Sequence, residues 1–217
     1  MWFIIAFIGY FVAALTVILD KFILTKSVGK PIVYTFYSTI FLFGIFFAWP
    51  LGVNWLSGID WLWALVSALA FGFGLWLFFI SVKKSEISHI GPFVGAMVAI
   101  YTYVLADYFL GENLNQAQMI GILILIFASL LLSFERTRLR NGFHIGFVWG
   151  IAAGVALGVS HVSAKYLYDT YGFITGLVWS KGLVGLVGLF IWIFPTVRMS
   201  LRQNRKPQNK AKNRKAL

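Results

Sequence analysis

The sequence predicts an all-α fold, a polytopic transmembrane bundle of about seven helices. Hydrophobic side chains make up 60% of its 217 residues and charged side chains only 12%, and the mean hydropathy is +0.84. A soluble domain of this composition would leave far too much apolar surface in water. The apolar residues form runs of about twenty, the length that a helix needs to cross roughly 30 Å of hydrocarbon. They show no period-two alternation, so membrane strands are not expected.

Local signals indicate where each helix begins and ends. Pro31 is expected at a helix start, where its missing N–H costs nothing, and Asn115 with Gln118 resembles a capping box. Pro50 and Pro195 are expected to close the second and seventh helices. The first run has neither a basic leader nor a small-residue cleavage pattern, so it is interpreted as a retained helix. The predicted spans are residues 2–24, 31–51, 61–82, 88–110, 116–134, 144–168 and 173–197.

Basic residues outside the predicted helices fall in every second gap, after the first, third, fifth and seventh helices. Since Lys and Arg in short loops stay cytoplasmic, this asymmetry predicts an outside N-terminus and an inside C-terminal tail. The tail, residues 198–217, has eight basic residues and no acidic one. It is predicted to be disordered and to lie near anionic lipid rather than to bind nucleic acid.

The end of the first predicted helix is similar to the end of the sixth. Each helix finishes on a lysine followed by an aromatic residue, with Lys21 in the first and Lys165 in the sixth, 144 positions apart. The offset spans an odd number of helices, so the second copy is expected to enter the membrane upside down, as in the inverted repeats of secondary transporters. Residues 1–135 are then a first five-helix unit, and residues 141–197 begin a second one. About three further helices would complete it, so the chain is expected to be truncated or completed by another chain.

Segments around the fourth and fifth predicted helices carry motifs of a known family. Pro92 follows a Ser-containing entry into the fourth helix, Leu110-Gly111-Glu112 ends it, and a Gln-x-x-Gly pattern begins the fifth at Gln118. In these motifs the chain resembles the drug/metabolite transporter superfamily, specifically its EamA-like members. The resemblance implies two inverted five-helix halves that transport a small metabolite by alternating access.

Two features depart from the family pattern. Ala99 stands near the place where a second proline is common in the fourth helix, so the helix break that it would cause is not expected here. Many members of the family keep both termini in the cytoplasm. The Lys and Arg asymmetry favours an outside N-terminus instead, and that orientation is retained because it comes from this sequence.

Polar and large aromatic side chains inside the predicted spans are candidates for the lining of a substrate cavity. An ionised group at membrane depth costs about 3 kcal/mol and is usually functional. Lys181, about 12 Å into the seventh helix, is therefore expected to face protein or a water-filled cavity. The candidates are Lys181, His161, Tyr103, Asp107, His89 and Trp76. The alternative roles are snorkelling or a salt bridge for the lysine, a core hydrogen bond for either histidine, headgroup hydration for the aspartate and lipid contact for the tryptophan.

Other recurrent or paired residues are interpreted as structural. A glycine recurs at every fourth position from Gly146 to Gly158 on the sixth helix, which favours close helix packing, with rocking of one half against the other as the alternative. Lys165 is expected to pair with Asp169 one turn later. Glu112 is expected to fix the connection between the fourth and fifth helices.

Few function classes fit this chain. It has no Cys and no nucleotide-binding glycine loop, so neither a cofactor, nor a metal site, nor ATP drive is predicted. Its carboxylates are scattered singly, which disfavours a membrane enzyme. A retinal photoreceptor would need a counter-ion carboxylate within residues 61–82, and that segment has none.

The leading prediction is a permease in a prokaryotic plasma membrane, and an accessory subunit without transport of its own stays open. The expected partners are a small-molecule substrate, a proton or exchanged solute, membrane lipids, and a second copy or completing chain, but no nucleic acid. A preference for anionic or zwitterionic solutes follows if Lys181 and His161 face the cavity.

Overall fold

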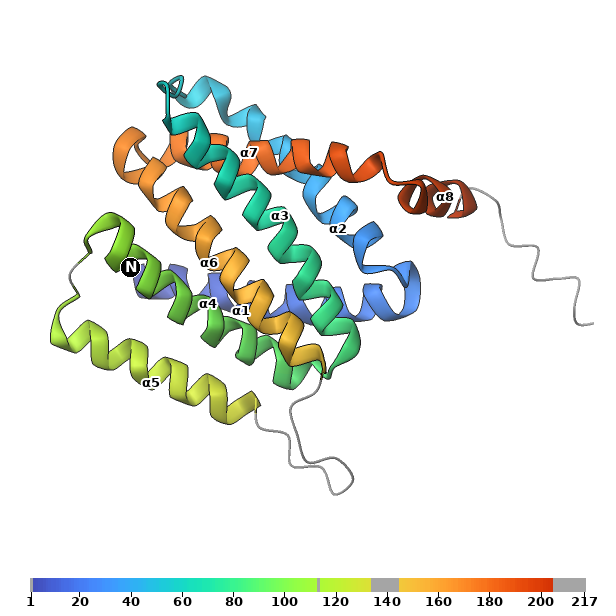
Figure 1. Ribbon diagram of the computed structural model, residues 1–217, viewed down its shortest axis with the longest axis horizontal. Helices are drawn as coiled ribbons and strands as arrows, with labels where there is room; N and C mark the ends of the chain where they lie inside the picture. Colours follow the sequence, from blue (N-terminus) through green and yellow to red (C-terminus); the bar gives the residue numbers. More distant parts are fainter. Residues whose placement is uncertain (1, 113, 134–144, 205–217) are drawn as a thin grey trace, which may run out of the picture.

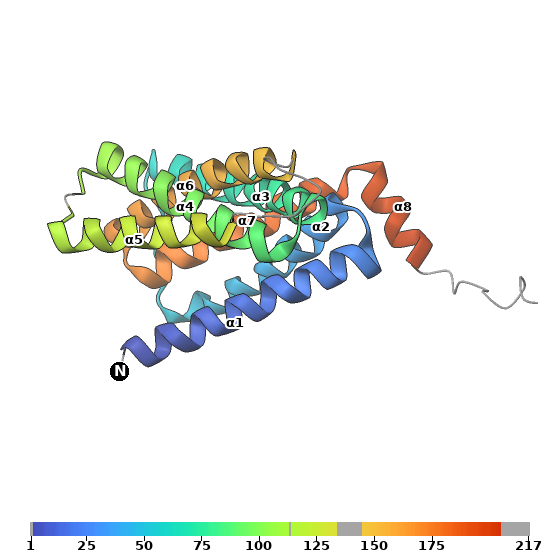
Figure 2. The same cartoon turned by 90° about the horizontal axis from the view of Figure 1, so that it is seen from below.

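A computed structural model describes residues 2–112, 114–133 and 145–204 as an α-helical bundle (Figure 1, Figure 2). Its elements are α1 (Trp2–Ile23), the π-helical turn η1 (Leu24–Val28), α2 (Pro31–Ile40), the 3₁₀ helix η2 (Phe41–Leu51), α3 (Asp60–Lys84), α4 (Ile87–Leu110), α5 (Gln116–Ser133), α6 (Ile145–Tyr171), α7 (Phe173–Trp192) and α8 (Pro195–Asn204). Within the described ranges, 7 helical spans are long and apolar enough to cross a membrane, and no strand occurs. The predicted fold class is confirmed.

The predicted helix starts are confirmed where a local signal defines them. Pro31 is the first residue of α2. Before α5, the backbone N–H of Asn115 donates to Gln118 Oε1 at 3.0 Å, and the backbone N–H of Gln118 donates to Asn115 Oδ1 at 2.8 Å. This reciprocal pair satisfies two backbone donors at the start of α5, where helices leave such groups without intrahelical partners.

Of the two proline predictions at helix ends, one needs correction. Pro50 lies next to the end of η2 at Leu51, which is the predicted end of the second span, and Gly52 follows at φ +91°. Pro195 begins α8 instead of closing the seventh helix, which already ends at Trp192 rather than at residue 197. Proline has no N–H to contribute and its φ suits the first helical turn, so it starts a helix as readily as it follows one.

The first part of the C-terminal tail is helical, because it belongs to α8. Residues 198–217 are predicted from the sequence to be disordered, but α8 continues as a helix to Asn204. Residues 205–217 lie outside the described residues. Arg198 Nε donates to the carbonyl oxygen of Trp192 at 3.1 Å, and its guanidinium lies 5.0 Å from the centre of the Trp192 ring. These contacts hold the start of α8 against the end of α7.

α6 packs against α3 on one side and against α4 on another. Its glycine ridge faces α4, because a Cβ atom on Gly154 would lie 2.4 Å from Met97 Cβ and one on Gly158 would lie 2.9 Å from Tyr101 Cβ. Carbon atoms of neighbouring side chains do not approach so closely, so only glycine permits this separation of the two helices. The packing interpretation of the ridge is confirmed.

α6 and α7 run in the opposite direction to the helices that they resemble. In both views α1 and α6 point opposite ways (Figure 1, Figure 2). α7 lies antiparallel to α2 and η2, since Gly182 lies beside Phe46 whereas Gly188 lies beside Thr39, earlier in the chain. These are the directions that an inverted repeat requires. The division of the chain into a five-helix unit and the start of a second unit stays a prediction.

The bundle has two ends of different charge. The end where α3 finishes and α4 begins, called the basic end here, carries Lys21, Lys26, Lys30, Lys83, Lys84 and Arg198 with Asp20 and Glu86. The opposite end, called the acidic end, carries Asp60, Asp107, Glu112 and Asp169 with Lys165. Lys21 Nζ donates to the carbonyl oxygens of Val82 and Ser85 at 2.5 and 2.7 Å. Lys21 and its repeat counterpart Lys165 therefore lie at opposite ends of the bundle, as expected.

Candidate functional site

Lys181 lies near the middle of a membrane-spanning helix. It is the ninth of the 20 residues of α7 and is half-buried. Its Nζ atom lies 3.9 Å from the centre of the Phe71 ring on α3, which is a cation–π contact. Among the described residues no carboxylate pairs with Lys181. An ammonium group at this depth without a compensating anion is costly, unless a ligand or water supplies the missing interactions.

His161 on α6 lies near Lys181, close enough for the two side chains to interact electrostatically. His161 is exposed, and its imidazole donates to the backbone carbonyl oxygen of Leu157 one turn earlier. Phe71 comes from α3, in the first predicted unit, whereas the lysine and the histidine come from the second. The three side chains thus gather where the two units meet, although a role in substrate binding stays a prediction.

The other four candidates lie elsewhere. Trp76 lines a groove between α2, α3 and α7, whereas Tyr103 lines a separate pocket of about 250 Å³ between α4 and α5. His89 Nδ1 is 3.1 Å from the carbonyl oxygen of Leu132, and this contact joins the start of α4 to the end of α5. Asp107 is exposed near the end of α4. The six candidates therefore do not meet in one cavity.

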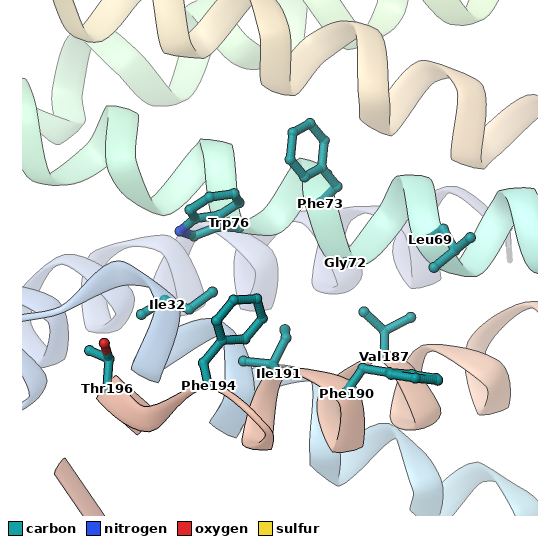
Figure 3. A pocket seen from close by; sticks show the side chains of 10 residues that line it. All are labelled: Ile32, Leu69, Gly72, Phe73, Trp76, Val187, Phe190, Ile191, Phe194 and Thr196. Carbon is teal, nitrogen blue, oxygen red and sulfur yellow. The ribbon is translucent and has the colours of Figure 1, made fainter. Parts of the chain in front are cut away.

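The groove beside Trp76 has a volume of about 630 Å³. Figure 3 shows it between α3, which contributes Leu69 and Trp76, and α7, which contributes Val187 among others. Ile32 of α2 and Thr196 of α8 lie at the same end of the groove as the indole. Apart from that indole and the threonine hydroxyl, the lining side chains are apolar.

Asp60, a carboxylate that the sequence does not single out, joins α3 to α6 at the acidic end. Its side chain is buried. Oδ1 accepts a hydrogen bond from the Tyr166 hydroxyl at 2.9 Å, and Oδ2 accepts from the hydroxyls of Tyr171 at 2.6 Å and Ser57 at 3.0 Å. From the sequence alone, Asp60 is only an acidic residue in the first turn of a helix. Its two tyrosine partners lie 106 and 111 positions later, so no local pattern could have revealed them.

Further polar contacts connect α6 with the first predicted unit. Inside the interface with α3, Ser67 Oγ donates to the carbonyl oxygen of Ser160 at 3.1 Å, and Ser160 Oγ donates to that of Ser67 at 2.8 Å. Toward the acidic end, Lys165 Nζ lies 2.8 Å from Glu112 and 3.2 Å from Asp169. The predicted pair with Asp169 is confirmed, and Glu112 adds a link from α6 to the connection after α4.

Comparison with known proteins agrees with the motifs around α4 and α5. The model of the EamA-like transporter family matches residues 1–134, more than half of the chain. The chain belongs to the EamA-like transporter family. No curated protein and no solved structure matches it.

The EamA match covers the helices from α1 to α5, whereas α6 and α7 lie outside it. Four of the six candidate residues are in the matched part, but Lys181 and His161 are not. Together with the membrane-spanning helices, EamA membership establishes an integral multi-pass membrane protein of transporter type. A transporter family is also consistent with the expectation that the chain is not an enzyme.

In this EamA-like chain, Asp60→Asn is expected to lower the midpoint of thermal unfolding in detergent. The amide nitrogen would face hydroxyl donors, so at least one hydrogen bond in a buried site is lost, at about 1–3 kcal/mol. Asp169→Asn is the control, because that side chain is 61% exposed, and an exposed ion pair contributes at most about 1 kcal/mol. Equal midpoints for the two variants would show that Asp60 does not hold α3 to α6.

Proposed function

We propose that this EamA-like chain transports a small anionic or zwitterionic solute across the membrane by alternating access. The observation that carries the proposal is Lys181, which lies at membrane depth beside His161 with no carboxylate partner in the described part of the chain. A carboxylate or phosphate group of the solute would supply the negative charge through a charge-assisted hydrogen bond. Because helices of both predicted units meet here, a bound solute would contact both.

Alternating access also requires that the two ends of the bundle open in turn. At the acidic end, Asp60 binds Tyr166 across the interface of α3 and α6, and Glu112 pairs with Lys165. At the basic end, the Ser81 hydroxyl donates to an α6 carbonyl oxygen at 2.6 Å. We infer that the acidic-end contacts break together when that end opens.

The proposed energy source is a proton gradient or an exchanged solute, since the sequence has no nucleotide-binding glycine loop. The proposed location is a prokaryotic plasma membrane, with the basic end on the cytoplasmic side. Positively charged residues outnumber acidic ones at that end, which supports this orientation.

The exposure of α1 favours a second candidate function, that of a subunit completed by further helices. Phe7, Phe11 and Ile18 are 66%, 59% and 59% exposed, whereas the repeat counterpart α6 is covered by α3 and α4. Helices in corresponding positions beside α1 would complete the inverted arrangement. The mass of the purified particle in detergent distinguishes a single chain from an assembly with a second copy or another chain.

A reversible cross-link between α3 and α6 tests alternating access. The chain has no Cys, so Ser67→Cys with Ser160→Cys introduces one defined pair. The two Oγ atoms are 3.5 Å apart, so a small adjustment brings the sulfur atoms to the disulfide distance of about 2.05 Å. Oxidation is expected to stop solute uptake into proteoliposomes and a reductant to restore it, because the link prevents relative motion of the two units.

The solute for this assay is chosen from a panel of radiolabelled carboxylates, phosphates and amino acids. The single variants Ser67→Cys and Ser160→Cys are the controls, and both are expected to transport normally under oxidising conditions. Undiminished uptake by the fully cross-linked double variant would rule out a mechanism in which α3 and α6 move apart.

A further inference from the structure

The groove beside Trp76 runs from the basic end of the bundle toward its middle. Ile32 is the second residue of α2 and Thr196 the second residue of α8, and both lie at the basic end. At its far end, Leu69 precedes the end of α3 at Lys84 by fifteen residues. That separation is about 22 Å at 1.5 Å per residue. The groove itself is shorter, because its α3 lining runs from Leu69 to Trp76, seven residues or about 10 Å, so it has the direction of an acyl chain and holds part of its length.

The size of the groove suits a lipid tail better than a protein helix. Phe73, Phe190 and Phe194 along it are 52%, 67% and 57% exposed, so the groove is open on its lipid-facing side. Its volume of about 630 Å³ is within the range of about 300–1,000 Å³ that holds drug-sized apolar ligands. A helix about 10–12 Å across displaces roughly 1,000 Å³ in two turns, which is more than the groove accommodates.

Two exposed basic residues lie close in sequence to the lining residues at the basic end of the groove. Lys30 is two residues from Ile32, Arg198 is two residues from Thr196, and both basic side chains are exposed. In the part of the chain that the structure describes, neither of them pairs with a carboxylate. The indole of Trp76 lies at the same end of the groove as Ile32 and Thr196 (Figure 3).

We propose that the groove binds one anionic phospholipid of the leaflet at the basic end. One acyl chain lies along the groove from Trp76 to Leu69, and the phosphate lies beside Lys30 and Arg198. Basic sites between membrane helices on the cytoplasmic side bind anionic headgroups in this way. The lipid contacts α2, α3, α7 and α8 at once, and so fastens the start of α8 to the bundle.

Native mass spectrometry of the purified full chain tests the proposal. The protein in detergent is titrated separately with phosphatidylglycerol and phosphatidylcholine. One retained phosphatidylglycerol is expected, with a preference over phosphatidylcholine of about fivefold for each flanking charge. Lys30→Gln with Arg198→Gln is expected to make the retention of the two lipids equal.

A filled groove distinguishes a specific site from ordinary lipid contact. Thr196→Trp fills the basic-end opening and is expected to abolish retention of phosphatidylglycerol. Met199→Trp is the matched control, because Met199 is 55% exposed on the same helix and does not line the groove. Leu69→Trp fills the far end and replaces Thr196→Trp if thermal unfolding in the same detergent shows that the latter does not fold.

Three outcomes would overturn the proposal. In the first, the wild-type chain retains both lipids equally, as for general lipid contact. In the second, the groove-filling variants retain phosphatidylglycerol as well as Met199→Trp does. In the third, filling the groove removes a second copy of the chain instead of a lipid, which would assign the groove to a protein interface.

Discussion

Lys181→Ala is expected to reduce solute uptake into proteoliposomes by about 10- to 100-fold at low solute concentration. A hydrogen bond between an ammonium group and an anionic solute contributes about 1.5–3 kcal/mol, and each 1.4 kcal/mol is about tenfold in affinity. Among the described residues, His161 interacts electrostatically with Lys181, and this interaction is repulsive when both are charged, so the histidine does not replace the lost ammonium group. Counterflow with radiolabelled carboxylates, phosphates and zwitterionic metabolites measures the loss.

Two variants separate the charge of Lys181 from general disturbance of the fold. Lys181→Arg keeps a cation that can stay over the Phe71 ring, and is expected to retain most of the uptake. Lys26→Ala removes a cation that lies 4.8 Å from the centre of the Phe22 ring at the basic end, and is expected to transport normally. If Lys181→Ala takes up every transported solute at the wild-type rate, Lys181 does not bind the solute.

The sequence predicts those features of the bundle whose cause is local. Run length and hydropathy define the membrane spans, and the capping box of Asn115 and Gln118 needs only side chains three positions apart. The glycine ridge is also local, since its four-residue spacing alone places it on one helix face. Pro195 is ambiguous by the same reasoning, because a proline suits the residues after one helix and the first turn of the next.

The features of the candidate site that escaped prediction depend on how distant helices face each other. Asp60 has its partners on α6, and Ser67 meets Ser160 at a separation of 93 positions. The repeat indicates which way α6 runs, but not which side chains of α3 it meets. For the same reason Trp76 and Tyr103, both placed inside spans by the sequence, line different pockets.

Gly154→Ala is expected to lower the midpoint of thermal unfolding in detergent and the yield of folded protein. The added Cβ atom would lie 2.4 Å from Met97 Cβ and 3.2 Å from the Met97 carbonyl carbon, so the backbone of α4 would have to move. Alanine favours a helix over glycine by about 1 kcal/mol. Overpacking of a close interface costs about 1–3 kcal/mol and occasionally more, so the clash is expected to outweigh the gain in helix propensity.

Gly95→Ala on α4 is the matched control, because a Cβ atom there would meet nothing within 4 Å. Helix propensity then acts alone, and the midpoint is expected to stay or rise. A lower midpoint for Gly154→Ala with an unchanged or higher midpoint for Gly95→Ala would show that α4 and α6 pack too closely to admit a Cβ atom at position 154. A higher midpoint for Gly154→Ala as well would mean that these helices lie further apart, and the close contact between the two predicted units would have to be abandoned. Because α4 and α6 belong to different predicted units, a folded Gly154→Ala protein should also transport more slowly than Gly95→Ala if the units move along the glycine ridge.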